Sequence, residues 1–276
     1  MAASMCDGAS AREGRPFLRW AGSKRKQIGR LKLYWSKKFL RYVEPFAGSA
    51  CLFFALQPEK ALLGDSNEEL INVYRQLRKH PREIHHRLVH IPRERKAYLR
   101  WRAKDVTKLD AKTRALRFIY LNHNCFNGIY RTNNAGQFNV PFGTKLSRYL
   151  SRDEFLECSA ALAQAEFSGG DFQKTLARVQ FGDFVYLDPP YALKTRRLFC
   201  EYGEKPFSVD DIERLSEELE RIDNIGATFV VSYADCPQSR ELAKRWKSVK
   251  FLVRRHIAGF SDNRSSAFEW LITNSV

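Results

Sequence analysis

The spacing of apolar positions along the chain predicts short buried strands separated by helices. Several apolar runs have the length of a buried strand and end at polar residues or at glycine. They are LRYV at 40–43, ALL at 61–63, FVYL at 184–187, TFVV at 228–231, VKFLV at 249–253 and FEWLI at 268–272.

Helical spacing of apolar residues occurs between these runs. Leu70, Val73, Tyr74 and Leu77 follow the i, i+3, i+4, i+7 pattern of one helix face. A second helix is predicted behind Ser208 and Asp211, which have the spacing of a capping box. Its apolar face consists of Ile212, Leu215, Leu219 and Ile222. Strands that alternate with helices favour an α/β fold, in which helices cover both faces of a parallel sheet.

The middle of the chain has a different pattern and predicts an insertion into this fold. Residues 80–122 hold no convincing strand and resemble basic helices, the last of them amphipathic over 113–121. Residues 123–145 are rich in Asn, Gly and aromatic residues, with a turn expected at 134–136 between two β-like runs. We therefore expect a flexible N-terminus over 1–14, a core over 15–79 and 156–276, and a mostly helical insertion with a β-hairpin over 80–155.

Composition excludes several classes of protein. The 276 residues contain no apolar stretch long enough to span a membrane, and the N-terminus lacks the apolar segment of a signal peptide. The six cysteines are scattered without a Cys-x-x-Cys pair or zinc spacing. We therefore expect a cytoplasmic protein with no disulfide framework and no metal site.

The positive charge is concentrated in two segments. The formal net charge is +16, and residues 75–155 hold 19 Lys and Arg against 6 Asp and Glu. Residues 1–43 hold 11 against 2, whereas the remaining segments are acidic. Such a concentration favours a nucleic-acid surface, because phosphates are contacted mainly by Lys and Arg. The alternative is a solvated helix surface, although such a surface normally mixes both signs.

Two short motifs suggest a nucleotide-like cofactor. The segment 44-EPFAGSA-50 follows the run at 40–43 and precedes LFFAL, so it predicts a strand, a tight small-residue turn and a helix. Gly48 would permit backbone to approach a ligand there, although an ordinary β-turn fits equally well. Asp65 ends the next strand and stands near the spacing of an acid that binds ribose hydroxyls. It could also cap the helix that begins near residue 67.

The strongest chemical motif is 188-DPPY-191, which follows the run at 184–187. Two prolines fix an extended turn and leave carbonyl groups free to accept hydrogen bonds. Asp188 and the Pro189 carbonyl would accept the two hydrogens of an exocyclic amine, and Tyr191 would stack on its ring. These acceptors favour a pyramidal nitrogen, whose lone pair can attack a methyl donor. The alternative is a rigid turn with Tyr191 in packing.

Taken together, the motifs resemble those of the Dam-like adenine-N6 DNA methyltransferases, of the D12 class and the alpha group. The match rests on their joint order, which is 19-RWAGSK-24, 44-EPFAGSA-50, 65-DSNEELINVY-74, 122-NHNCFNGIYR-131, 136-GQFNVPFG-143 and 188-DPPY-191. The resemblance implies a Rossmann-like methyltransferase sheet and S-adenosylmethionine as methyl donor. It also implies transfer to N6 of an adenine flipped out of double-stranded DNA.

The resemblance also assigns residues to each site. The catalytic residues would be Asp188, Pro189, Pro190 and Tyr191. The cofactor would be bound by Trp20, Lys24, Phe46, Ala47, Gly48, Asp65, Asp171, Phe172 and Asp188, with Asp171 bonded to its adenine and Phe172 stacked on it. By their own pattern, Asp171 and Phe172 could equally be a loop acid and a core aromatic. DNA would be contacted by Phe126, Asn127, Gly128, Arg131, Asn139, Pro141 and Lys145, where Phe126 enters the duplex and Arg131 reads guanine.

Three positions depart from the family pattern. Ala50 and Ser23 stand where glycine is common, and both replacements are small. The segment 143-GTKLSRY-149 lacks the aromatic that members methylating GATC often carry near Lys145. A GATC-like target is therefore compatible with the motifs, while the exact recognition sequence stays open.

The same residues fit or exclude several other functions. A C5-cytosine methyltransferase would need a Pro-Cys nucleophile, and no proline is followed by cysteine. Methyltransferases acting on cytosine N4, on RNA or on protein glutamine use a similar amine pocket and remain alternatives, as does a non-catalytic DNA-binding module. We expect a monomer on DNA, encoded by a bacterium or phage, with a cognate restriction endonuclease acting separately in some settings.

Overall fold

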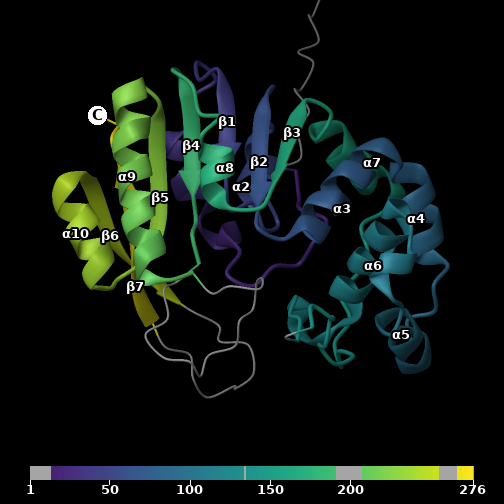
Figure 1. Ribbon diagram of the computed structural model, residues 1–276. Helices are drawn as coiled ribbons and strands as arrows, with labels where there is room; N and C mark the ends of the chain where they lie inside the picture. Colours follow the sequence, from purple (N-terminus) through teal and green to yellow (C-terminus); the bar gives the residue numbers. More distant parts are fainter. Residues whose placement is uncertain (1–13, 134, 191–206, 255–265, 276) are drawn as a thin grey trace, which may run out of the picture.

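The computed structural model describes residues 14–133, 135–190, 207–254 and 266–275, and its centre is a mixed sheet (Figure 1). The strand order is β3-β2-β1-β4-β5-β7-β6. In chain order the strands are β1 (Arg41–Glu44), β2 (Ala61–Asp65), β3 (Ala165–Gly169), β4 (Asp183–Leu187), β5 (Thr228–Ala234), β6 (Lys247–Arg254) and β7 (Ser266–Thr273). The α/β class expected from the sequence is confirmed.

The sheet is parallel only in part. The strands β3, β2, β1, β4 and β5 pair in parallel, whereas β7 pairs antiparallel with both β5 and β6. Each of the expected apolar runs lies in a strand, apart from Leu40, which precedes β1, but β3 was not anticipated. Its sequence AEFSG contains no continuous apolar run, and Glu166 is exposed because β3 lies at the edge of the sheet.

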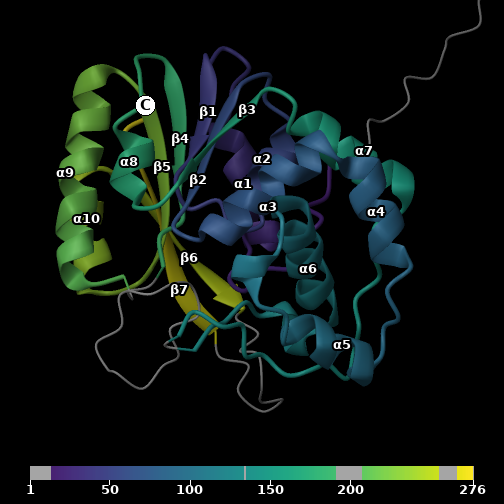
Figure 2. The ribbon, with the colours of Figure 1, turned by 45° about the vertical axis from the view of Figure 1, so that its right-hand side comes forward.

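Helices cover both faces of the sheet (Figure 2). The side chains of β1 show the two cores that result. Successive residues of a strand point to opposite faces. In β1, Tyr42 belongs to a core with α2 (Cys51–Leu56) and α3 (Glu68–Lys79). Its neighbour Val43 belongs to a second core with α8 (Phe172–Leu176), α9 (Val209–Ile225) and α10 (Pro237–Arg245). Both helices expected from apolar spacing, α3 and α9, are confirmed, and the Ser208–Asp211 capping box opens α9.

The segment between β2 and β3 is mainly helical and gathers beyond the β3 edge (Figure 1). After α3 it contains α4 (Pro81–Val89), α5 (Arg95–Arg102), η3 (Val106–Lys108), α6 (Ala111–Asn124), η4 (Phe126–Gly128) and α7 (Arg152–Ala161). Helix α6 packs against α3, α4 and α5, and α7 packs against α3 and α4. The expected division of the chain into domains stays a prediction, and its boundary after residue 155 falls inside α7.

The expected β-hairpin is reduced to isolated bridges. Among the described residues, Cys125 pairs with Phe142 and Thr132 with Phe138, both antiparallel, without forming a continuous ladder. Proline 141 has no N–H to donate, and the Asn133 side chain accepts the N–H groups of residues 135 and 137. Local side-chain bonds therefore replace part of the ladder.

The N-terminal segment packs, before β1, on the face of the sheet that α2 and α3 cover. It contains η1 (Lys24–Gln27), α1 (Ile28–Leu31) and η2 (Lys32–Tyr34). No helix within the described ranges is both long and apolar enough to cross a membrane.

A buried histidine ties this N-terminal segment to the insertion. His123 lies at the end of α6, with Nε2 at 2.7 Å from the Phe17 carbonyl and Nδ1 at 2.9 Å from Ser147 Oγ. A carbonyl can only accept, so Nε2 carries the hydrogen. Burial lowers the pKa of His123 to about 4, and the positive charges of Arg93 and Arg19 add to this. The fold therefore favours the neutral imidazole.

We expect acid to destabilise the protein through His123. The folded pKa lies below the unfolded value, so the stabilisation is present above pH 6.5 and is lost as pH falls toward 4. Between pH 7.5 and 5 the wild type should lose about 2 kcal/mol of unfolding free energy more than His123→Gln. Urea unfolding at the two pH values measures this, with the exposed His86→Gln as control. Equal losses in wild type and His123→Gln would contradict it.

Candidate active site

The residues of interest converge because four parallel strands end on one side of the sheet. Gly48 lies in the turn after β1, Asp65 ends β2, Asp171 follows β3 and Asp188 follows β4. Ligands of open α/β sheets bind outside the carboxyl ends of the strands. The fold thus gathers at one edge residues that are far apart in the sequence.

Gly48 is held from three directions. Its N–H donates to Asp65 Oδ2 at 2.9 Å, and its carbonyl accepts the Tyr74 hydroxyl at 2.5 Å. Its φ is +47°, and a Cβ there would come within 2.7 Å of the Trp20 indole. Only glycine fits this position without strain. Ala50 adopts a similar left-handed conformation with φ of 49°, where glycine is common in the family pattern.

Asp65 connects the turn to helix α3. Its Oδ1 accepts the N–H of Asn67 at 2.9 Å, while Oδ2 accepts that of Gly48. Burial raises the pKa of Asp65 to about 6, and these two backbone bonds oppose the shift. The helix cap itself is Asn67, whose side chain accepts the N–H groups of Glu69 and Leu70. Asp65 therefore does not cap α3 itself. It bonds the N–H of the cap residue Asn67 and that of Gly48, and so holds the turn beside the start of the helix.

Asp188 lies at the end of β4, and one of its carboxylate oxygens is bonded to two other side chains. Its Oδ1 lies 2.8 Å from Lys24 Nζ and accepts the Ser232 hydroxyl at 2.9 Å. Its Oδ2 has no bond to another residue in the described parts of the chain. Burial raises the pKa of Asp188, and Lys24 opposes that shift. Pro189 is buried, and the Pro190 carbonyl accepts the Tyr233 hydroxyl at 3.4 Å. Tyr191 lies outside the described residues.

Several partners of Asp188 were not found by sequence reasoning. Lys24 Nζ is also 3.9 Å from Glu269, whose Oε2 accepts Gln27 Nε2 at 2.7 Å. Ser232 is linked at 3.0 Å to the hydroxyl of Tyr186. The sequence did hold a signal for Glu269, which is an acid inside the apolar run FEWLI. A carboxylate in a buried strand is normally paired, so this position indicated a buried partner.

A further buried carboxyl lies close by. Glu44 at the end of β1 is buried and accepts the Tyr42 hydroxyl at 3.0 Å. Burial raises the pKa of Glu44 well above its ordinary value, and the negative charges of Asp188 and Asp65 add to the rise. Glu44 therefore lies within electrostatic reach of both acids.

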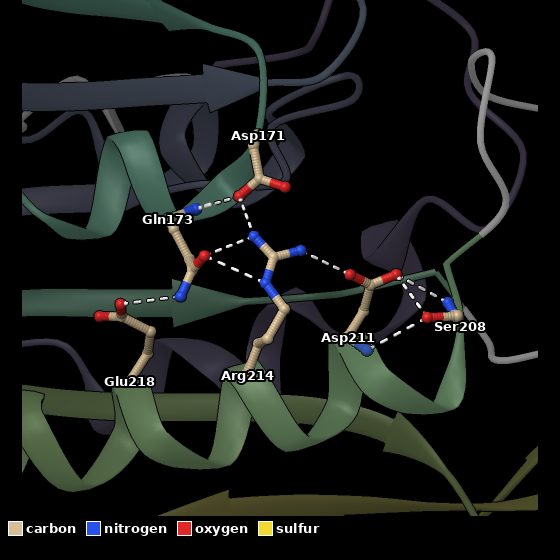
Figure 3. Close-up of polar contacts among 6 residues, drawn as sticks. All are labelled: Asp171, Gln173, Ser208, Asp211, Arg214 and Glu218. Atoms are coloured by element: carbon tan, nitrogen blue, oxygen red, sulfur yellow. Dashed lines mark hydrogen bonds and ion pairs between the residues drawn. The ribbon is translucent and has the colours of Figure 1, made fainter.

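Asp171 and Phe172 begin helix α8. Asp171 Oδ1 accepts the Gln173 N–H at 2.9 Å and pairs with Arg214 of α9 at 2.7 Å (Figure 3). Phe172 is buried, with its ring centroid 5.4 Å from that of Phe46. The structure thus confirms the structural interpretation of this pair, because Asp171 caps a helix and Phe172 is a core aromatic. Their role in cofactor binding stays a prediction.

The predicted DNA-contacting residues lie on the loop after α6. Phe126 and Asn127 are exposed, and Asn127 adopts a left-handed conformation with φ of 53°. Gly128 is buried against Arg19, so a Cβ there would lie 2.6 Å from the Arg19 side chain. Arg131 Nε donates to Asn139 Oδ1 at 2.9 Å.

The remaining residues of this set frame the same loop. The Pro141 carbonyl accepts the Phe126 N–H at 2.9 Å, and Lys145 is exposed. Trp20 of the first predicted cofactor motif stacks on Phe118 of α6 and on Tyr130 of the loop. The loop is therefore packed directly on this predicted motif.

Comparison with known proteins identifies the family. A family model described as D12 class N6 adenine-specific DNA methyltransferase matches residues 20–257. The chain belongs to this family. The type II methyltransferase M1.LlaDCHI of Lactococcus lactis subsp. cremoris is 34% identical over 270 residues, which cover 94% of this chain and 95% of that protein.

Two further relatives of this chain are named DNA adenine methylase. The protein of Vibrio cholerae (El Tor Inaba N16961) is 34% identical over 235 residues, covering 83% of this chain and 84% of its own. The protein of Escherichia coli (strain K12) is 29% identical over 265 residues, covering 94% and 95%. The resemblance drawn from the motifs is confirmed, and the protein is an adenine-specific DNA methyltransferase.

Membership of the D12 family implies S-adenosylmethionine as the methyl donor. The residues at the strand ends fit such a group, because the turn at Gly48 leaves no space for a side chain and the second oxygens of Asp171 and Asp188 have no bonding partner in the described ranges. Within the same ranges, no cluster of three His, Cys, Asp or Glu forms a metal site.

Proposed function

We propose that this D12 methyltransferase acts on one adenine flipped out of double-stranded DNA, with Asp188 as the acceptor for the N6 amino group. The supporting observation is that the two oxygens of its carboxylate have different surroundings. Lys24 and Ser232 both contact Oδ1, so Oδ2 is left to accept a hydrogen from the substrate. A base within a duplex cannot reach such a pocket, which is why the adenine must leave the stack.

The amine pocket would increase the nucleophilicity of N6. S-adenosylmethionine supplies an electrophilic methyl group when bound. Asp188 and the Pro189 carbonyl would each accept one N6 hydrogen and so keep the nitrogen lone pair available. Acceptors fixed in advance stabilise the positive charge that develops on the amine. Pro190 would hold the turn, and Tyr191 would stack on the target base.

The cofactor would lie along the ends of β1 to β4. Gly48 and Ala47 form the turn, in which the Ala47 N–H donates to the Gly64 carbonyl at 2.8 Å. Trp20 covers Gly48, and Lys24 would act through Asp188. The remaining cofactor residues would be Phe46 beside Phe172, Asp65 at the ribose and Asp171 at the adenine.

The insertion, residues 80–155, would recognise DNA. Its excess of Lys and Arg would contact phosphates, and Phe126 on its exposed turn would enter the duplex. Asn127, Gly128 and Pro141 would shape that turn. We propose a GATC-like target read by a monomer, and the type II name of the Lactococcus relative favours a partner restriction endonuclease that acts separately.

The test is the position of the transferred label. Plasmid is incubated with the protein and methyl-labelled S-adenosylmethionine, digested to nucleosides and separated. We expect the label in N6-methyladenine, and sequencing of modified positions gives the recognition site. Label in N4-methylcytosine, or none in a correctly folded preparation, would overturn the proposal.

Arg131 provides a test of base reading. We expect Arg131→Ala to lose about 1–3 kcal/mol of discrimination against substitution of one guanine in the site, because a guanidinium bonds guanine at two atoms. Arg131→Lys keeps the charge but not this geometry, so it should show the same loss. The measurement is kcat/KM on the target and on singly substituted duplexes. A uniform fall for all duplexes would instead assign Arg131 to phosphate binding.

A further inference from the structure

Arg214 on helix α9 is the centre of a polar cluster that joins two distant parts of the chain (Figure 3). Its guanidinium contacts Asp171 Oδ1 at 2.7 Å and Asp211 Oδ1 at 2.6 Å. Its Nε donates to Gln173 Oε1 at 3.0 Å, and its Nη2 contacts the same oxygen. One side chain thus holds both Asp171 and Gln173, the residues at either side of Phe172.

The same guanidinium lies over an aromatic ring. Its central carbon is 4.9 Å from the centroid of Phe172, within the range of a cation–π contact. Arg214 therefore contacts both residues of the pair Asp171 and Phe172. Asp211 and Gln173 also bond the guanidinium, so its position against Asp171 and Phe172 is fixed.

The partners of Arg214 are themselves held in place. Asp211 Oδ2 accepts the N–H of Ser208 at 2.8 Å and its hydroxyl at 3.0 Å, which fixes the first turn of α9. Gln173 Nε2 donates to Glu218 Oε1 at 3.4 Å. The cluster thus connects the loop after β3 to the N-terminal half of α9.

The cluster leaves one acceptor unused. Both bonds to Asp171 fall on Oδ1, from the Gln173 N–H and from Arg214, so the carboxylate cannot rotate freely. Oδ2 forms no hydrogen bond or ion pair with the other residues drawn in Figure 3, nor with any other residue in the described parts of the chain. A fixed carboxylate oxygen suits an amino group, which donates hydrogen, and does not suit a carbonyl, which only accepts.

We propose that Arg214 is a positioning residue that makes the cofactor site selective for an adenine ring. It acts by presenting Asp171 Oδ2 to the exocyclic amino group while it packs on Phe172. This inference rests on the proposed cofactor role of Asp171. It predicts discrimination between adenine and hypoxanthine, because hypoxanthine carries a carbonyl oxygen in place of that amino group.

The experiment compares equilibrium binding of two ligands to the full chain by calorimetry. S-adenosylhomocysteine carries adenine, and S-inosylhomocysteine carries hypoxanthine. Wild type should prefer the adenine ligand by tenfold or more, on the order of one hydrogen bond to a charged group. Arg214→Gln should reduce this preference toward one, and Arg214→Lys should retain part of it. Arg245→Gln is the matched control, because Arg245 of α10 pairs with Glu220 of α9 outside the cluster.

The outcomes separate this inference from the proposed cofactor site. If Arg214→Gln weakens both ligands equally, or changes neither, Arg214 is only structural and the inference is wrong. If Asp171→Asn keeps the full preference, the assignment of Asp171 to adenine is wrong, and the inference falls with it. Thermal unfolding of the ligand-free variants shows whether each is folded. If Arg214→Gln is unfolded, the loss of preference is measured on Arg214→Lys instead.

Discussion

Replacing Asp188 by asparagine should lower the rate of methyl transfer by about 10²–10³-fold or more, the loss expected when one fixed electrostatic contact to a reacting group is weakened. Asparagine keeps the shape of the side chain and an oxygen for Lys24 and Ser232. It removes the negative charge that stabilises the amine as it becomes positive. Asp188→Ala should abolish transfer and should also destabilise the fold, because Lys24 then loses its contact at 2.8 Å.

The measurement is single-turnover transfer to duplex DNA, together with DNA binding by fluorescence anisotropy. We expect the DNA affinity of Asp188→Asn to stay within about twofold, because its effect is confined to the amine pocket. The control is Asp210→Asn, which removes an exposed carboxylate from the first turn of α9. Full activity in Asp188→Asn would overturn the assigned role of Asp188.

Replacing Lys24 by methionine should destabilise the protein by about 3–5 kcal/mol at pH 8, because it leaves a buried carboxylate without its counter-charge. The side chains of Lys24 and Asp188 are only 6% and 22% exposed, so water can replace the lost contact only in part. Lys26→Met in the same 3-10 helix is the control, since Lys26 is exposed and its removal should cost less than about 0.5 kcal/mol.

The destabilisation by Lys24→Met should become smaller in acid. Burial already raises the pKa of Asp188, and loss of Lys24 raises it further. A carboxyl whose folded pKa exceeds its unfolded value loses stability as pH rises between the two values, so acid relieves the defect. Denaturant unfolding at pH 8 and pH 5 measures this difference. A defect of equal size at both pH values would show that Lys24 acts through packing and not through charge.

The confirmed sequence predictions are those that depend on local patterns. Helix α3 follows from the spacing of Leu70, Val73 and Tyr74, and the capping box at Ser208 correctly placed the start of α9. The family was evident because its motifs combine unusual residues in a defined order. Strand β3 was missed, since an exposed edge strand lacks a continuous apolar signal, and the predicted β-hairpin is present only as isolated bridges.

The α/β class, the family and the adenine methyltransferase activity follow from the sequence alone, because periodicity and motif order are properties of the sequence. Which side chains meet depends on the tertiary fold. Lys24 and Asp188 are far apart in the sequence, as are Asp171 and Arg214, yet both pairs are in contact. Parallel strands bring their carboxyl ends to one edge whatever the length of chain between them, so the partners of each carboxylate follow from the strand order and not from local sequence.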